Sequence, residues 1–288
     1  MTQRDAFWGQ VEDRMGVDNR CIVLTGDMGA PALDNIRRRF PHRFVNCGCR
    51  EQAMVDIAVG MALEGLWPVV YGIVPFVTSR CYEQIKMAAV MGVHLTIVGV
   101  GAGLGYADAG PTHHGMDDYN IMRIIPRITV YTVSSNSMAK YCARQMCKGL
   151  VYVRLDRDTL PEIHYAPLPG VVPDMDREFA TGVWVHRKGT RYIIAHGYMV
   201  HTALKVAEQA GYGVIEIFRH PWDDVIPFGE HYVVMEENYS RGGLWSAVLE
   251  QEAYMASNKI IGWGTRGGLH KELCIDEKGA LEWLIGLG

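Results

Sequence analysis

The sequence predicts an α/β protein, with a doubly wound parallel-sheet domain followed by a smaller α/β domain. Three observations support this prediction. Short apolar runs alternate with longer runs of helical spacing through residues 1–160, which is the pattern of a parallel sheet covered by helices. Prolines then interrupt the pattern, and the same alternation restarts further along the chain.

The first domain is expected to span residues 1–160. Its predicted strands are the short β-branched or apolar runs Cys21–Leu24, Arg43–Asn46, Pro68–Gly72, Leu95–Val100, Ile128–Thr132 and Leu150–Arg154. The predicted helices between them are Glu51–Gly65, Ser79–Met91, Met116–Ile125 and Ser137–Gly149. Gly65 and Gly149 are placed to end their helices, because glycine readily adopts the left-handed conformation that follows a helix.

A linker is expected over residues 161–178, where the helical and strand spacings fail. The prolines that interrupt regular structure are Pro161, Pro167, Pro169 and Pro173. A second domain over residues 179–288 then repeats the alternation, with predicted elements at Arg191–Ala195, Val200–Ala210, Gly213–Phe218, His231–Met235, Leu244–Met255, Lys259–Trp263 and Glu277–Leu287.

Composition favours small-molecule chemistry. The 288 residues carry a formal net charge of −4 without a dense Lys/Arg block, so neither nucleic acid nor an anionic membrane is an expected partner. No apolar run reaches the ~20 residues of a membrane span. The polar start Met1–Asp5 does not resemble a signal peptide, and seven scattered cysteines suit a reducing compartment. We therefore expect a cytoplasmic protein.

Glu51 lies in the first group of residues that could carry chemistry. The segment 46–52 leaves a predicted strand, turns at Gly48 and enters a predicted helix, and open α/β sheets bind ligands at that end of their strands. On local grounds Glu51 has two interpretations. It is a functional carboxylate, or it stabilises the helix N-terminus by about 0.3–1 kcal/mol.

A second group is the glycine-rich segment 99–115, which ends with His113 and His114. Its glycines let the backbone approach a ligand closely, although their spacing is a weak signal for a dinucleotide site. A metal site is not expected. Adjacent histidines seldom point at one ion, and Cys47 and Cys49 lack a second pair of thiols.

In chain order, these segments resemble the pyrimidine-binding and C-terminal domains of transketolases and deoxyxylulose-phosphate synthases. The resemblance covers nearly the whole chain and depends on the order of its motifs. They are Thr25-Gly-Asp27-Met-Gly, Gly48-Cys-Arg-Glu51-Gln-Ala-Met, Gly110-Pro-Thr-His113-His-Gly, Met122-Arg-Ile-Ile-Pro126, Arg157-Asp-Thr-Leu-Pro161, Ala195-His-Gly197, Glu236-Glu-Asn-Tyr239 and Gly242-Gly-Leu244.

The resemblance implies thiamine diphosphate as cofactor and Glu51 as a catalytic residue. In such families the matching glutamate hydrogen-bonds the N1′ nitrogen of the aminopyrimidine ring. Proton exchange there converts the 4′-amino group to an imine, which removes the proton from the thiazolium carbon. Burial must then let the carboxyl hold a proton against the helix dipole. The resemblance also implies that Phe76 stacks on the ring, unless it is a core aromatic, and that Arg80 and Asp27 line the cofactor site.

Substrate contacts are implied for three more residues. His113 matches a histidine that faces the reacting centre, where it would bind substrate oxygens or move a proton. His114, which follows it, is expected beside the substrate as well. Arg157 matches an arginine that grips sugar phosphates, although a surface arginine in a charged loop is the alternative.

The resemblance also implies a partner chain. The Gly-Asp-Gly signature that holds a divalent ion against the diphosphate is absent, since Asp27 lies in Gly-Asp-Met-Gly. We therefore expect a separate polypeptide to bind the diphosphate through Mg²⁺ or Ca²⁺. The expected assembly is a heterotetramer with two copies of each chain, in which this chain also contacts its own copy.

Two departures from the family pattern leave the substrate open. Ala109 stands where an aspartate is usual, with Asp108 shifted by one, and a histidine expected near Gly101 is absent. Losing such polar contacts argues for an altered donor, such as a less hydroxylated ketone or a 2-oxo acid. The expected reaction passes a two-carbon unit from a ketose or 2-oxo acid to an aldehyde. The alternatives are the beta subunit of a 2-oxo acid dehydrogenase and a non-catalytic structural or regulatory subunit.

Overall fold

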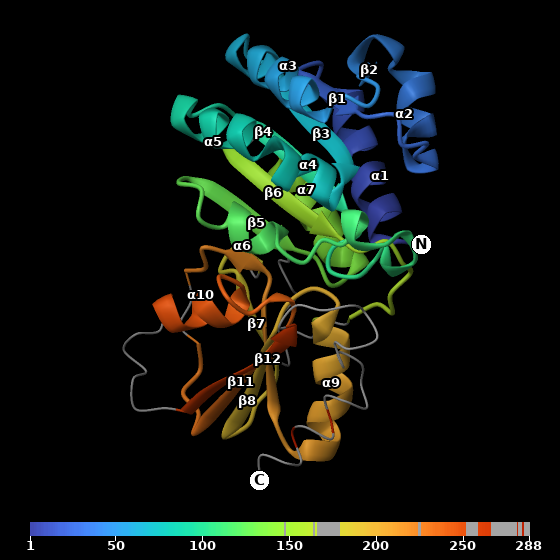
Figure 1. The fold of residues 1–288 in the computed structure, drawn as a ribbon. Coiled ribbons are helices and arrows are strands. Elements are labelled where there is room, and N and C mark those ends of the chain that lie inside the picture. The colour runs from blue at the N-terminus through green and yellow to red at the C-terminus, as the bar shows by residue number, and fades with distance from the viewer. Residues whose placement is uncertain are drawn as a thin grey trace. The chain divides into compact units, whose positions relative to one another are not determined.

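The computed structural model describes residues 1–146, 148–163, 165, 179–223, 226–251, 259–265, 281 and 284. The chain divides into two compact units, Met1–Glu162 and Ile163–Gly288, and each is an α/β structure built around one sheet (Figure 1). The predicted fold class is thereby confirmed. Among the described residues, no helix is both long enough and apolar enough to cross a membrane.

The sheet of the first unit is parallel, with its strands in the order β5-β6-β4-β3-β1-β2. These strands are β1 (Cys21–Thr25), β2 (Phe44–Asn46), β3 (Trp67–Ile73), β4 (Leu95–Val100), β5 (Ile128–Thr132) and β6 (Leu150–Leu155). Every residue of β4 and β6 is buried, as expected for central strands with helices on both faces.

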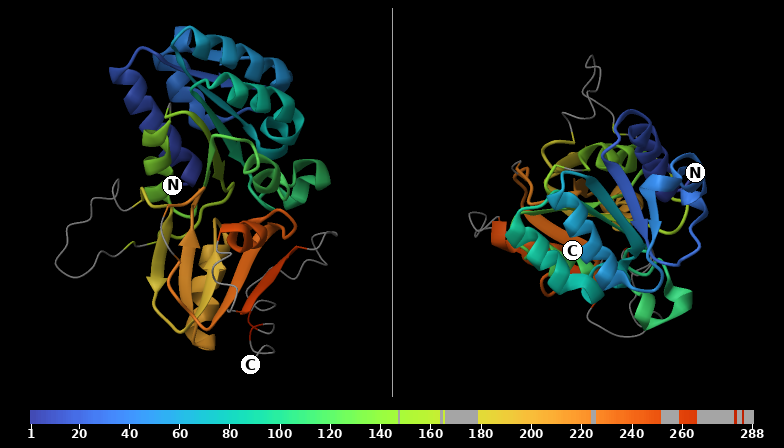
Figure 2. Two further views of the ribbon diagram at one scale, coloured as in Figure 1. Left: turned by 90° about the vertical axis from the view of Figure 1, so that its left-hand side faces the viewer. Right: turned by 90° about the horizontal axis from the view of Figure 1, so that it is seen from above.

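Helices cover both faces of this sheet. α1 (Gln3–Val17) and α7 (Asn136–Gln145) lie together on one face, and α3 (Glu51–Leu63) and α5 (Tyr82–Met91) lie on the other, as the left view of Figure 2 shows. Shorter helices fill the connections: α2 (Asp34–Arg39), α4 (Val74–Val77), α6 (Asp118–Met122) and the 3₁₀ turns η1 (Pro31–Leu33), η2 (Pro41–Arg43), η3 (Ser79–Cys81), η4 (Ala107–Ala109) and η5 (Pro111–His113).

Helix α1 is absent from the sequence-based assignment. It begins with a capping box in which the Thr2 side chain accepts from the Asp5 amide and the Asp5 side chain accepts from the Thr2 amide. Its apolar side packs Phe7, Trp8 and Met15 into the core. The capping box usually has Glu or Gln at its fourth position, so aspartate there is a weaker signal in the sequence.

All four helices predicted in the first unit differ from the structure at one end or both, and α3 and α7 end at Leu63 and Gln145, before the predicted Gly65 and Gly149. The segment predicted as one helix over Ser79–Met91 starts with η3, and its α-helical part begins at Tyr82. The segment predicted over Met116–Ile125 is helical only between Asp118 and Met122. Apolar spacing identifies the buried side of a helix but not its ends, which depend on how the terminal amides and carbonyls are hydrogen-bonded.

The second unit contains a five-stranded sheet in the order β12-β11-β8-β9-β7. Its described elements are β7 (Val183–Arg187), β8 (Arg191–Ala195), α9 (Met199–Ala210), β9 (Gly213–Ile217), the short β10 (Arg219–His220), β11 (His231–Tyr239), α10 (Leu244–Gln251) and β12 (Lys259–Thr265). β7, which the sequence pattern did not predict, pairs antiparallel with β9, and the other pairs are parallel.

Parts of several sequence predictions lie outside the described residues, among them residues 252–255 of the element predicted over Leu244–Met255. Of the linker predicted over 161–178, the structure describes only 161–163 and 165. Of the helix predicted over Glu277–Leu287, it describes only Leu281 and Leu284, both helical.

Candidate active site

The loops at the carboxyl ends of the first sheet enclose a cleft of about 270 Å³. Carboxyl ends of parallel strands meet along one edge, so loops distant in sequence converge there. The lining residues come from the loops after β1 and β2, the start of α3, the end of β3, α4 and η5: Gly26, Asp27, Met28, Cys49, Glu51, Gly72, Ile73, Phe76 and His113. Four residues predicted from the sequence, Asp27, Glu51, Phe76 and His113, therefore lie together.

Glu51 is the first residue of α3, reached through a turn in which Gly48 has a φ of +66°. Its carboxylate forms an ion pair with Arg80, 2.8 Å between Oε2 and Nη1. The Glu51 side chain is only 13% exposed, whereas the Arg80 side chain is 46% exposed. The structure thus places Glu51 inside the cleft with a cation at its outer side.

Phe76 projects from α4, the short helix that begins directly after β3. This close return of the chain requires glycine at position 72, because a Cβ there would lie 2.5 Å from Cγ1 of Val77. The Arg80 guanidinium carbon lies 4.2 Å from the centre of the Phe76 ring, within the range of a cation–π contact. Arg80 therefore contacts both Glu51 and Phe76.

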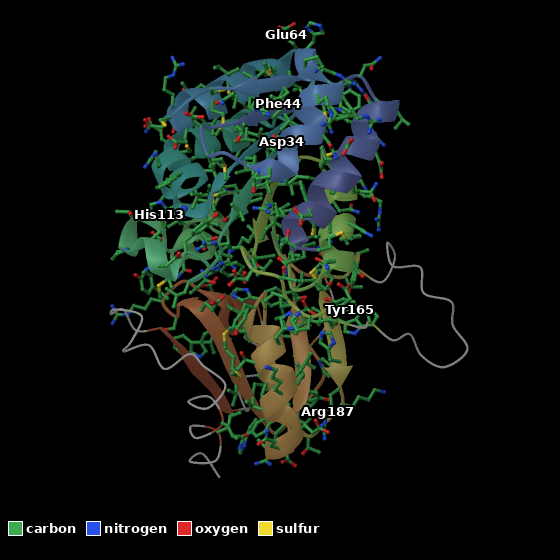
Figure 3. The ribbon with its side chains drawn as sticks, turned by 90° about the vertical axis from the view of Figure 1, so that its right-hand side faces the viewer. Asp34, Phe44, Glu64, His113, Tyr165 and Arg187 are labelled. Carbon is green, nitrogen blue, oxygen red and sulfur yellow. The ribbon has the colours of Figure 1, made fainter. Side chains whose placement is uncertain are left out.

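His113 ends η5 and faces Phe76 edge-on, with 5.0 Å between ring centres. Its Nδ1 lies 3.0 Å from the hydroxyl of Thr112. Paired hydrogen bonds of 2.8 Å between the backbones of Gly103 and Gly115 close the base of this loop, and Figure 3 labels His113 within it. The loop closure is what places the imidazole beside a ring that comes from the preceding strand connection.

Two predicted substrate residues do not line the cleft. The Nε2 atom of His114 is buried and has no hydrogen-bond partner within the described part of the chain. Arg157 lies after β6 and forms an ion pair of 2.6 Å with Asp108. That contact lowers the pKa of the Asp108 carboxyl, because the guanidinium donates a hydrogen bond to it.

Tyr106, which the sequence analysis did not single out, contacts both Arg157 and His113. Its ring lies 4.5 Å from the guanidinium carbon of Arg157 and 6.1 Å from the centre of the His113 ring. It therefore connects Arg157 to the cleft. In the sequence, Tyr106 could have been noticed as the one large aromatic side chain of the glycine-rich segment 99–115.

The described residues form no cluster of metal ligands. Among the residues with described placement, no group of three or more His, Cys, Asp or Glu side chains lies close enough to hold an ion. The described cysteines are free thiols: Cys21, Cys47, Cys49, Cys81 and Cys142.

Comparison with protein families gives one match to this unit. The model described as the pyrimidine-binding domain of transketolase matches residues 1–162. A chain named as one of the subunits of the apulose-4-phosphate transketolase of Actinobacillus succinogenes is 31% identical over 251 residues, which are 82% of this chain and 78% of that protein. These matches confirm the resemblance seen in the motifs.

Other relatives are much longer. The 1-deoxy-D-xylulose-5-phosphate synthase of Pseudomonas putida is 33% identical over 269 residues, which cover 89% of this chain but 41% of that protein. The chain thus spans less than half the length of this relative.

Solved structures give the same fold. A structure described as a split gene transketolase, inactive beta4 tetramer, aligns with a TM-score of 0.84 at 20% identity, covering 99% of this chain and 97% of that one. A transketolase mutant from Pichia stipitis aligns with a TM-score of 0.81 at 16% identity, covering 99% of this chain and 45% of that one. At these identities the alignments establish the fold alone.

Proposed function

This chain belongs to the transketolase family of thiamine-diphosphate enzymes, and we propose that it is the subunit that holds the cofactor's aminopyrimidine ring in a two-chain enzyme. The proposed reaction transfers a two-carbon ketol or acyl unit from a ketose or 2-oxo acid to an aldehyde. The observation that carries this proposal is the convergence of Glu51, Phe76 and His113 on one cleft.

The residues of the cleft fit an aminopyrimidine ring. A flat heterocycle needs an apolar face to stack on and a polar group at its edge. Phe76 and Ile73 supply apolar surface, and the largely buried Glu51 carboxylate supplies the polar group. The volume of about 270 Å³ is sufficient for one such ring.

Each residue then has a proposed task. Glu51 holds or moves a proton at the ring nitrogen, and Phe76 orients the ring by stacking. Arg80 keeps the Glu51 side chain at the cleft through their ion pair, and Asp27 lines the same cleft. His113 binds a substrate oxygen or moves a proton there. When bound, thiamine diphosphate supplies a carbon nucleophile and an electron sink.

A partner subunit is proposed to complete the site. Its expected contribution is the diphosphate-binding domain, which would hold the diphosphate through Mg²⁺ or Ca²⁺. The relative of similar length is named as one subunit of its enzyme, which supports a two-chain organisation here. We propose two copies of each chain, with this chain also contacting its own copy.

The test is to co-express this chain with the product of the neighbouring gene and to measure thiamine-diphosphate-dependent turnover. Glu51→Gln removes the carboxylate but keeps the side-chain shape. It should lower kcat by at least about a hundredfold, since acid–base groups contribute about 10²–10⁴-fold, while the assembly keeps its mass on size-exclusion chromatography.

Glu64→Gln is the matched control, because Glu64 caps the opposite end of α3 and is exposed (Figure 3). It should leave turnover unchanged. Full turnover of Glu51→Gln in an intact assembly would refute the proposed role of Glu51. A panel of ketoses, ketose phosphates and 2-oxo acids would then identify the donor.

A further inference from the structure

Arg157 is held on one side by the loop that carries His113. Its Nη1 donates to the Asp108 carboxylate at 2.6 Å and to the Gly105 carbonyl at 3.4 Å. The guanidinium also lies over the Tyr106 ring. Its Nε and Nη2 atoms make no hydrogen bond to any residue that the structure describes. One edge of Arg157 is therefore occupied, and the other is available to a ligand.

This available edge lies one aromatic ring away from the cleft, because Tyr106 lies between Arg157 and His113. A substrate whose reacting end contacts His113 would extend its other end toward Arg157. All of these residues belong to the first unit. The substrate group to which Arg157 donates therefore depends on the charge that already surrounds the guanidinium.

Two nearby carboxylates already balance the positive charge of the Arg157 guanidinium. Asp108 is in direct contact, and Asp158 also acts on Arg157 at longer range. The other cation that acts on Tyr106 is Arg4, which lies 3.5 Å from its own partner Asp5. A phosphate dianion placed at Arg157 would meet both carboxylates and be repelled. A hydroxyl or carbonyl oxygen would accept from Nη2 without that repulsion.

We propose that Asp108 is a specificity-determining residue, which neutralises Arg157 so that the site prefers substrates ending in a hydroxyl or carbonyl group over phosphorylated ones. This inference rests on the proposed function, because it assumes that substrate reaches Arg157 from the cleft. It also differs from what the names of two relatives state, since both are named for phosphorylated sugars.

The first experiment measures binding of inorganic phosphate to the full chain alone, by calorimetry at pH 8 and low ionic strength. Asp108→Asn keeps the side-chain size and removes the charge, and Asp108 is exposed, so folding should be retained. This variant should bind phosphate at least tenfold more tightly than the unmodified chain. The double variant Asp108→Asn with Arg157→Gln should lose the gain.

The matched control is Glu12→Gln, which removes the acid of an ion pair of equal length, 2.6 Å with Arg39, outside the residues that line the cleft. It should not change phosphate binding. Equal phosphate affinity of the unmodified chain and Asp108→Asn, or a gain that survives Arg157→Gln, would overturn the proposal.

The second experiment uses the assembly with the partner subunit. The ratio of kcat/KM for glyceraldehyde 3-phosphate over glyceraldehyde should rise about tenfold in Asp108→Asn and stay low when Arg157→Gln is added. An unchanged ratio in Asp108→Asn would overturn the proposal. If no assembly turns over any substrate, the proposed function fails, whereas the phosphate titration still decides the role of Asp108.

Discussion

At the scale of single residues, the neighbours of His113 determine what its ring can do. The imidazole lies beside Phe76, and its Nδ1 is engaged with the Thr112 hydroxyl. If Nδ1 is held in this way, the other ring nitrogen is the one that can meet a substrate oxygen. The side chain is thereby oriented by a neighbouring residue of its own loop.

Replacing His113 by asparagine should therefore impair turnover and spare cofactor binding. Asparagine retains a hydrogen-bonding group but cannot move a proton near neutral pH. We expect kcat of the assembly to fall about tenfold to a hundredfold, with an unchanged thiamine-diphosphate dissociation constant in a fluorescence titration. His42→Asn, at an exposed position in η2, is the control and should match the unmodified enzyme.

Asp156 couples stability to pH. Burial raises the pKa of its carboxyl from 3.8 to about 6, against the opposing effect of the Asp158 amide that donates to it. A raised carboxyl pKa means that the folded state binds the proton more tightly than the unfolded state. Protonated Asp156 therefore contributes its full stabilisation of the fold below about pH 4, and this stabilisation is lost as the pH rises from about 4 through about 6.

Asp156→Asn should remove this loss, because the amide is neutral at every pH and its oxygen can still accept from the Asp158 amide. The gain in unfolding free energy should be small near pH 4 and reach about 2–3 kcal/mol at pH 7. Denaturant titration of the chain at both pH values measures it. Asp13→Asn at an exposed position should show no such trend, and a gain independent of pH would contradict this explanation.

At the scale of elements, a buried ion pair joins α6 to β6. Asp118, the first residue of α6, accepts from Arg154 at 2.5 and 3.0 Å and from the Tyr152 hydroxyl at 2.6 Å. The Asp118 and Arg154 side chains are 0% and 2% exposed. This contact anchors the chain just after the loop that carries His113.

Breaking that pair should destabilise the fold strongly, because a buried guanidinium would lose its counter-charge. We expect Asp118→Asn to cost about 3–5 kcal/mol of unfolding free energy, measured by denaturant titration with thermal melting as a check. Asp34→Asn removes the acid of an exposed pair with Arg37, for which about 0–1 kcal/mol is expected. Similar losses in the two variants would mean that burial of the pair does not matter.

The element assignments show where sequence reasoning succeeds. The buried strands β4 and β5 begin and end where their apolar runs predicted them, at Leu95–Val100 and Ile128–Thr132. Gly101 follows β4, and Arg127, whose φ is +66°, precedes β5. Helix α1 was missed because its Asp5 capping signal is weak and Gly9 and Gly16 interrupt the helical composition; tertiary packing of Phe7 and Trp8 stabilises it.

At the scale of the whole molecule, the cleft supplies groups for a ring but not for a divalent ion, as far as the described residues extend. Because we propose that a partner subunit holds the diphosphate and its ion, we expect this chain alone to show no thiamine-diphosphate-dependent turnover, and the assembly with its partner to show it. Chelation by EDTA should abolish the turnover of the assembly, and Mg²⁺ or Ca²⁺ should restore it. Turnover by the isolated chain, or turnover insensitive to EDTA, would contradict the proposed division of tasks.

The sequence by itself determined the fold class, most strands, the family, and the identity of Glu51, Phe76 and His113 as candidates. These features can be predicted from the sequence because they depend on the spacing of apolar residues and on the order of motifs along the chain. The convergence of these candidates in one cleft was an expectation until the parallel sheet brought its carboxyl ends together.

Only the tertiary structure showed which acidic and basic side chains form ion pairs at the site. Arg80 is 29 positions from Glu51, and Arg157 is 49 positions from Asp108. Contacts over such separations depend on how loops pack after the sheet has formed, and no local pattern encodes them. The pairing of Arg157 with Asp108, and with it the charge that a substrate would meet, therefore became visible only in three dimensions.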